Sequence, residues 1–185
     1  MKRVFIAVKV EPGGELLRMI SSLKALLEAE NIKWVDTANI HLTLVFLGDT
    51  EEKRIKILVS MLRERCTGFN EFEFILAGTG VFKNYWDPRV IWIGIRSSER
   101  LIMLYNSIAE GLKHIGLEIR ERQFRPHLTL GRIKSVRDTD NLKSFLERYK
   151  NTEFQKVEVK EVILFESILS QTGPIYKSLG NFPLS

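Results

Sequence analysis

The sequence predicts an α+β protein built from two pseudo-symmetric copies of one β-α-β-β-α-β unit. The tetrapeptide His-Leu-Thr-Leu occurs at 41–44 and returns unchanged 86 residues later, at 127–130. Strand-like and helix-like patterns follow one another in the same order around both copies, which indicates an internal duplication. The length of 185 residues suits a single domain with its own core. We therefore expect one bilobal domain, 1–185, with lobe-forming repeats at about 3–82 and 89–168 and a C-terminal extension at 169–185.

The first copy opens with apolar and β-branched residues from 3 to 9, which predict a strand that ends before the turn residues Pro12-Gly13-Gly14. Leucine and isoleucine then recur every three or four residues from 16 to 27, which predicts a helix with one apolar stripe. The remaining elements expected here are a short strand at 33–35, a strand at 39–47 closed by Gly48-Asp49, a helix from about Thr50 to Cys66, and a strand at 71–82 broken near Gly78 and Gly80.

The second copy repeats this order. Arg3-Val4 corresponds to Arg89-Val90, which opens a predicted strand at 90–95. A helical stripe at 100–115 ends at Gly116, a natural C′ residue. The same offset predicts a helix at 138–149 and a strand from 157 to 165 and beyond.

Composition indicates a soluble globular protein. The chain has 28% charged and 44% hydrophobic residues, which excludes disorder and a fibrous repeat. It contains no apolar run long enough for a signal peptide or a membrane-spanning helix, so a cytoplasmic protein without a membrane partner is expected. The single cysteine, Cys66, excludes an internal disulfide and a cysteine-based zinc site, and we interpret it as inert packing.

The net charge of +5 favours an anionic partner but does not choose among nucleic acids, nucleotides and acidic proteins. The basic residues concentrate around the second motif, which predicts a positive potential on one side of it; a solvated basic face is the alternative. They are Arg120, Arg122, Arg125, Arg132, Lys134 and Arg137.

Each motif places a histidine and a threonine on one face of a strand. Ile40, Leu42 and Leu44 alternate with His41, Thr43 and Val45, so the leucines are expected in the core and the other three on the polar face. In the second motif, alternation makes Gly131 the next residue on the polar face after Thr129, where it would leave room for a bulky anion. If the copies pack about a two-fold axis, two imidazoles and two hydroxyls converge on one cleft.

Two imidazoles suit concerted acid and base catalysis. An unperturbed imidazole titrates near pH 6.5, so one can be protonated while the other is free. One histidine would donate a proton to a leaving oxygen while the other takes one from the nucleophile. Threonine hydroxyls can hold the non-bridging oxygens of a phosphate, so phosphodiester cleavage is the natural match.

Other candidates are weaker. Only two histidines converge, and no Asp, Glu or Cys stands at ligand spacing beside either motif, so no metal is expected. His114 falls in the last turn of its predicted helix and is interpreted as surface structure. Tyr85 and Trp86 could stack a base, although anchoring of their own loop is the better interpretation.

The motifs and their surroundings resemble the 2H phosphoesterases, specifically the RNA 2′,3′-cyclic phosphodiesterase group once called 2′-5′ RNA ligases. The similar stretches are Asn39 to Gly48 and Phe124 to Arg132. The start at Arg3 to Ala7 and the tail from Glu166 to Tyr176 are also similar. The resemblance covers essentially the whole chain, and it implies a bilobal α+β fold with antiparallel sheets around a central cleft.

The resemblance also implies an activity: metal-independent hydrolysis of 2′,3′-cyclic phosphates on RNA ends or nucleotides to 2′-phosphomonoesters. We expect a monomer that needs no cofactor. It makes His41 the proton donor and His127 the proton acceptor, with Thr43 and Thr129 holding the phosphate. Further candidates for substrate contact are Arg132 and Tyr176. The near-symmetry of the motifs does not by itself assign the two histidine roles. The alternatives are the reverse reaction, 2′-5′ ligation of tRNA halves, and a non-catalytic nucleotide- or RNA-binding module.

Overall fold

The structure, a computed structural model, describes residues 1–119, 123–171 and 173–185. It contains four α-helices and nine strands among these residues, close to the order that the sequence predicts. In chain order they are β1 (Lys2–Lys9), α1 (Gly14–Leu26), β2 (Asn31–Trp34), a 3-10 turn (Thr37–Asn39), β3 (His41–Thr50), α2 (Glu52–Cys66), β4 (Phe72–Phe82), β5 (Val90–Arg96), α3 (Glu99–His114), β6 (His127–Ser135), α4 (Thr139–Arg148), β7 (Glu153–Val159), β8 (Glu161–Ser170) and β9 (Gly173–Pro183).

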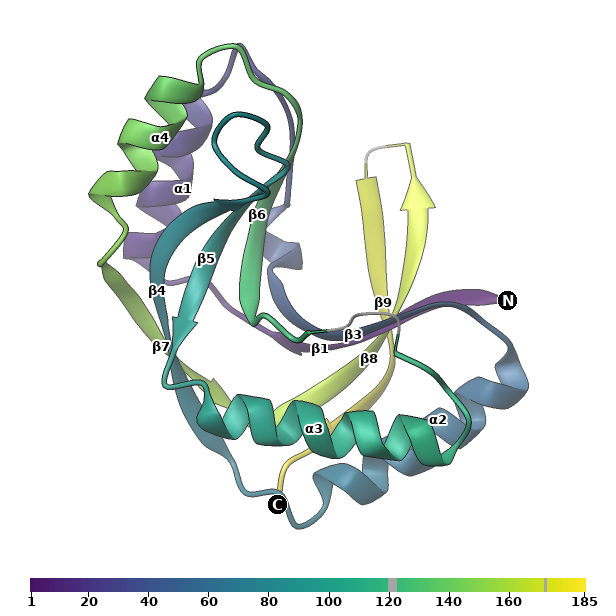
Figure 1. Ribbon diagram of the computed structural model, residues 1–185. Coiled ribbons are helices and arrows are strands. Elements are labelled where there is room, and N and C mark those ends of the chain that lie inside the picture. The colour runs from purple at the N-terminus through teal and green to yellow at the C-terminus, as the bar shows by residue number, and fades with distance from the viewer. Residues whose placement is uncertain (120–122, 172) are drawn as a thin grey trace.

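All strands belong to one antiparallel sheet with the order β7-β4-β5-β6-β3-β1-β8-β9, and β2 pairs separately with β6. The sheet is curled, and its helices lie on the outer side (Figure 1). Helices α1 and α4 accompany the half that contains β4 and β7, whereas α2 and α3 lie side by side beneath the other half. The result is the bilobal α+β fold that was predicted.

The two motif strands meet at the centre of the sheet. β3 and β6 are joined through the pair Leu42–Leu128, and these two residues are equivalent under the 86-residue offset. Equivalent residues that pair with each other must lie on a pseudo-two-fold axis, so this pair marks that axis.

The two repeats exchange strands across this axis. β4, from the first repeat, pairs with β5 from the second, while β8, from the second repeat, pairs with β1 from the first. Each half of the sheet therefore contains strands from both repeats. The expectation that the repeats at about 3–82 and 89–168 each form one lobe is wrong, because the last strand of each repeat pairs in the half of the sheet that holds the first strand of the other.

One expected element differs. The strand predicted from 157 to 165 and beyond is two strands, because the extended structure is interrupted between Val159 and Glu161. β7 pairs with β4 at one end of the sheet, whereas β8 pairs with β1 in the other half. The C-terminal residues pair along the whole of β8 as β9. Hydrophobic patterning marks both segments as strands but carries no information about their distant partners.

The core lies between the sheet and the helices. Each helix buries one apolar stripe, for example Leu101, Leu104 and Ile108 of α3, all fully buried. Burial of one such side chain stabilises the fold by about 1.5–3 kcal/mol. Cys66 is also fully buried, and burial raises the pKa of its thiol to about 12, which confirms the interpretation of inert packing.

Candidate active site

The motif side chains lie on the two central strands, on the side of the sheet away from the helices. His41 and Thr43 are on β3, and His127 and Thr129 are on β6. All four are half-buried, whereas the intervening Leu42 and Leu128 are fully buried in the core. Since neighbouring strand residues point to opposite faces, the four polar side chains share the concave face. In the antiparallel register of the Leu42–Leu128 pair, each histidine corresponds to the threonine of the other motif.

Both motif strands carry a β-bulge at the second leucine of the motif. Thr43 pairs with Ala7 and Val45 with Ile6, which leaves Leu44 without a partner on β1. Leu130 is the extra residue in the same way between β6 and β5. A bulge inserts one residue into one strand and therefore reverses the inside-outside alternation beyond it.

The bulges overturn two expectations about the polar face. Val45 and Gly131 are both buried rather than on the motif side. A Cβ at Gly131 would lie 2.9 Å from Ile32 Cγ2 and 2.9 Å from Trp34 Cε3, so this glycine makes room for side chains of β2 and not for an anion.

The bulges also bring the residues after Val45 and Gly131 to the motif side. These are Phe46 in the first strand and Arg132 in the second, and both are exposed. The two repeats thus present equivalent histidines and threonines but differ at this position, where only the second repeat supplies a cation.

The two imidazoles are held by equivalent hydrogen bonds. His41 Nδ1 lies 2.7 Å from the carbonyl oxygen of Asn39, and His127 Nδ1 lies 2.7 Å from that of Arg125. A carbonyl oxygen can only accept, so Nδ1 carries the hydrogen and donates it in both rings. The hydrogen bonds recorded for the two histidines within residues 1–119, 123–171 and 173–185 involve Nδ1 alone, so Nε2 is available for chemistry.

Aromatic rings fix the orientation of both imidazoles. Phe5 lies with its ring centroid 4.9 Å from that of His41, and Tyr176 meets the same imidazole edge-on at 5.1 Å. Phe82 packs at a right angle on His127, with 4.6 Å between the ring centroids. Packing and the Nδ1 hydrogen bond together restrict each ring to one direction.

The electrostatic environment lowers the pKa of both histidines. Burial is the main cause in each case; the backbone carbonyl opposes it, and the positive charge of Arg132 lowers both values further. The same arginine also acts on the phenol of Tyr176, whose pKa is nevertheless raised because burial dominates. Arg132 is therefore within electrostatic reach of both imidazoles, and it favours their neutral form when no ligand is bound.

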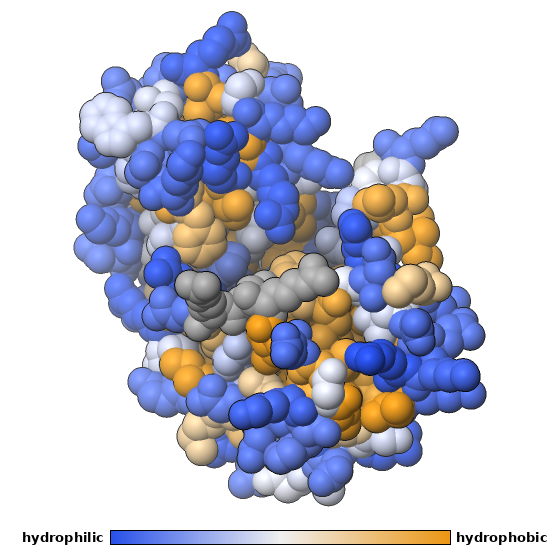
Figure 2. Space-filling model, turned by 45° about the vertical axis from the view of Figure 1, so that its right-hand side comes forward, coloured by the Kyte–Doolittle hydropathy of each residue, from blue (hydrophilic) through white to orange (hydrophobic). Residues whose placement is uncertain are grey.

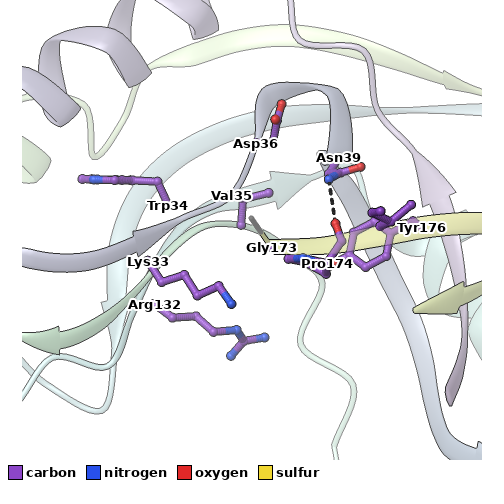
Figure 3. Close-up of a pocket in the computed structure, with 10 residues that line it drawn as sticks. Lys33, Trp34, Val35, Asp36, Asn39, Arg132, Gly173, Pro174 and Tyr176 are labelled. Carbon is purple, nitrogen blue, oxygen red and sulfur yellow. Dashed lines mark hydrogen bonds between the residues drawn. The ribbon is translucent and has the colours of Figure 1, made fainter. Parts of the chain in front are cut away.

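A cavity of about 440 Å³ opens beside Arg132. Arg132 and Lys33 point into it side by side, with Tyr176 at the opposite wall (Figure 3). Asn39 Nδ2 donates a hydrogen bond to the carbonyl oxygen of Pro174, 3.3 Å away, which ties the start of β3 to the β8–β9 hairpin. His41 lines an adjoining hollow that shares Asn39 and Tyr176 with this cavity. The molecule is deeply notched between its two lobes (Figure 2).

The remaining candidates are the third histidine, the loop aromatics and two arginines of the predicted basic cluster. His114 is exposed in the last turn of α3, where Arg65 Nη2 lies 3.2 Å from its Nδ1. Trp86 is 92% exposed in the β4–β5 loop, so the interpretation that it anchors this loop is wrong, whereas Tyr85 is partly buried against the core. Arg120 and Arg122 of the predicted basic cluster lie outside the described residues.

Neither a metal cluster nor a membrane span was found in the described part of the chain. No three side chains of His, Cys, Asp or Glu are grouped there so as to hold a metal ion. Nor does any helix there have the length and apolar character needed to cross a membrane.

Lys33 is a cationic residue at the cavity that the motifs did not reveal. Its position beside Arg132 arises from the pairing of β2 with β6, roughly a hundred residues further along the chain. No local pattern signals such a pairing.

Comparison with known proteins is consistent with this geometry. The sequence profile of the LigT like Phosphoesterase family matches twice in succession, over residues 6–92 and 93–176. A protein of Archaeoglobus fulgidus named RNA 2′,3′-cyclic phosphodiesterase is 36% identical over 181 residues, which is 97% of this chain and 99% of that protein. A Thermotoga maritima protein of the same name is 35% identical over 181 residues, 96% of this chain and 92% of that one.

Solved structures share the fold. A Thermus thermophilus protein superposes with a TM-score of 0.81 and 26% identity, over 98% of this chain and 97% of that chain. Escherichia coli LigT without ligand superposes with a TM-score of 0.74 and 25% identity, over 100% and 98% of the two chains. The family profile spans both repeats and the relatives align over nearly their full length, so the chain belongs to the LigT like phosphoesterase family.

Proposed function

We propose that the protein is an RNA 2′,3′-cyclic phosphodiesterase that produces 2′-phosphomonoesters. The observation that carries the proposal is the pair of imidazoles on adjacent central strands, each with Nδ1 bonded to a carbonyl and Nε2 free. The relatives named above carry this activity in their names, which favours hydrolysis over both ligation and binding without turnover.

In the proposed reaction, water attacks the phosphorus and the bond from phosphorus to the 3′-oxygen breaks. His127 Nε2 takes a proton from the water, and His41 Nε2 gives one to the departing 3′-oxygen. The 2′-oxygen keeps the phosphate. In each turnover His127 gains a proton and His41 loses one, so proton exchange with solvent restores the starting protonation state of both histidines. Family resemblance, not the near-symmetric geometry, is the basis for this division of roles.

The acid must be protonated before the reaction, although its pKa is lowered in the free protein. Burial and Arg132 disfavour the imidazolium in the empty site. A bound phosphate anion supplies the opposite charge and favours it. Substrate binding and proton uptake by His41 are therefore coupled.

The phosphate is proposed to be held by Thr43, Thr129 and Arg132. The threonines share the concave face with the histidines, and their hydroxyls can donate to the non-bridging oxygens as charge accumulates there. Arg132 offers a planar fork of donors that suits a phosphate. Tyr176 packs on His41 and lines the cavity, so it is proposed to position the acid and the ribose.

One chain supplies every group in this scheme, so a monomer has a complete site. We propose that the protein acts as a cytoplasmic monomer, as one bilobal domain, on RNA ends or nucleotides that carry a 2′,3′-cyclic phosphate.

The test is hydrolysis of 2′,3′-cyclic nucleotides in the presence of a chelator. His41→Ala and His127→Ala are each expected to lower kcat by about 10²–10⁴, the usual contribution of a general acid or base. His114→Ala, on the outer surface, serves as the matched control and should leave kcat unchanged. Activity that survives both motif substitutions, or that the chelator abolishes, would refute the proposal.

A further inference from the structure

Two cations stand side by side at the edge of the proposed site. Lys33 of β2 and Arg132 of β6 are direct partners across the strand pair. Directly opposed residues on paired strands project from the same face, about 4.5–5.5 Å apart at Cβ. Both side chains are exposed and extend in the same direction (Figure 3).

Within the described part of the chain, no carboxylate forms an ion pair with either cation. Among the described residues, the ion pairs within 4.0 Å include neither Lys33 nor Arg132. Asp36 lines the same cavity, but it lies on the far side from the two cations, and its Oδ1 accepts a hydrogen bond from the Ala38 N–H at 2.9 Å. Two cations without a carboxylate partner at the entrance of a cavity favour the binding of an anionic ligand.

The cavity adjoins the hollow that His41 lines, and the two share Asn39 and Tyr176. Tyr176 lines it and also packs edge-on against His41. Arg132 lines it and also acts electrostatically on both histidines. One substrate molecule can therefore reach both places, with one part in the cavity and another part at the histidines.

We propose that this cavity binds the phosphodiester immediately upstream of the terminal nucleotide, with Lys33 as its main contact, and thereby selects RNA ends over mononucleotides. This inference rests on the proposed function. In that reaction the 3′-oxygen of the terminal nucleotide is the leaving group, so the substrate can extend only toward its 5′ side. In an RNA chain, the next anionic group of the substrate is then the upstream phosphodiester. Arg132 serves the reacting phosphate, which leaves Lys33 for the next one.

The test compares two substrates with the same reacting end. One is a 2′,3′-cyclic mononucleotide, and the other is a dinucleotide with the same terminal cyclic phosphate. Lys33→Gln is expected to raise KM for the dinucleotide about tenfold, as for loss of one charge-assisted contact, with kcat and mononucleotide hydrolysis unchanged within about twofold. The slope of log affinity against log salt for the dinucleotide should fall by about 0.7, the value for one phosphate contact on a single strand.

Two controls sharpen the test. Lys56→Gln removes the same charge from the exposed surface of α2 and should change KM and kcat for neither substrate. A dinucleotide with an uncharged methylphosphonate linkage removes the partner instead. With this substrate, KM of the wild type should rise by about the same factor as in the Lys33→Gln variant with the natural dinucleotide. Lys33→Gln should cause no further rise in KM with the methylphosphonate, because the effects of two groups that contact each other are not additive.

If Lys33→Gln raised KM equally for the mononucleotide and the dinucleotide, or for neither, the inference would be overturned. An additive loss with the methylphosphonate would also overturn it, because Lys33 would then not contact that linkage. Failure of the proposed function is distinguishable, since it appears as absent mononucleotide hydrolysis in the wild type.

Discussion

Arg132→Gln tests the link between the bulge in β6 and the chemistry of the site. The substitution removes the positive charge but keeps a polar side chain of similar length. The arginine reaches the motif face only because Leu130 is the extra residue of the bulge. From there its charge lowers the pKa of both His41 and His127.

Two separate effects are expected. Loss of a hydrogen bond to a charged phosphate costs about 1.5–3 kcal/mol, which corresponds to about 10- to 150-fold in kcat/KM. Removal of the charge also raises the pKa of both histidines. The profile of kcat/KM against pH reports the acid and base of the free enzyme, so both of its limbs should move to higher pH.

The assay is kcat/KM for a 2′,3′-cyclic mononucleotide across the pH range, with wild type, Arg132→Gln and Arg132→Lys. The lysine variant keeps the charge but not the planar fork, so it should keep the wild-type limbs and recover only part of the rate. Lys56→Gln controls for a change in net charge. An Arg132→Gln profile that superimposes on the wild type, or moves to lower pH, would refute the electrostatic reasoning.

Three further outcomes follow from the same geometry. Thr43→Val and Thr129→Val are each expected to lower kcat by about 10²–10³, measured with a cyclic mononucleotide, because a donor to the phosphate is lost. Gly131→Val should destabilise the protein by about 1–3 kcal/mol in denaturant unfolding, since the new side chain overlaps Ile32 and Trp34. Because the folded protein lowers the pKa of both motif histidines, their contribution to stability is present above pH 6.5 and is lost as pH falls through the lowered values.

Each of these outcomes can be checked separately. Unchanged kcat in both threonine variants would show that the threonine hydroxyls take no part in the reaction. Gly14→Val, at the exposed start of α1, matches the glycine substitution without the overlap at β2. A variant with glutamine at both motif histidines should lose the corresponding part of the dependence of stability on pH. If it keeps the wild-type dependence, other groups are responsible.

The sequence by itself determined the element order and the chemical groups. Hydrophobic periodicity is a local property, so helices such as α3 and strands such as β5 were predicted to within one or two residues. The repeated motif identified the histidines and threonines and, through the leucines between them, the face on which they lie. Those assignments needed no knowledge of the partner strands.

The tertiary structure decided which strands pair and where alternation is interrupted. A bulge exists only relative to the neighbouring strand, so nothing local showed that the chain beyond Leu44 and Leu130 changes face. The pairing of β2 with β6 is equally non-local, yet it places Lys33 beside Arg132. Local sequence carries the period of each element, whereas hydrogen bonds between distant segments set the register. The register therefore decided which cations stand at the site.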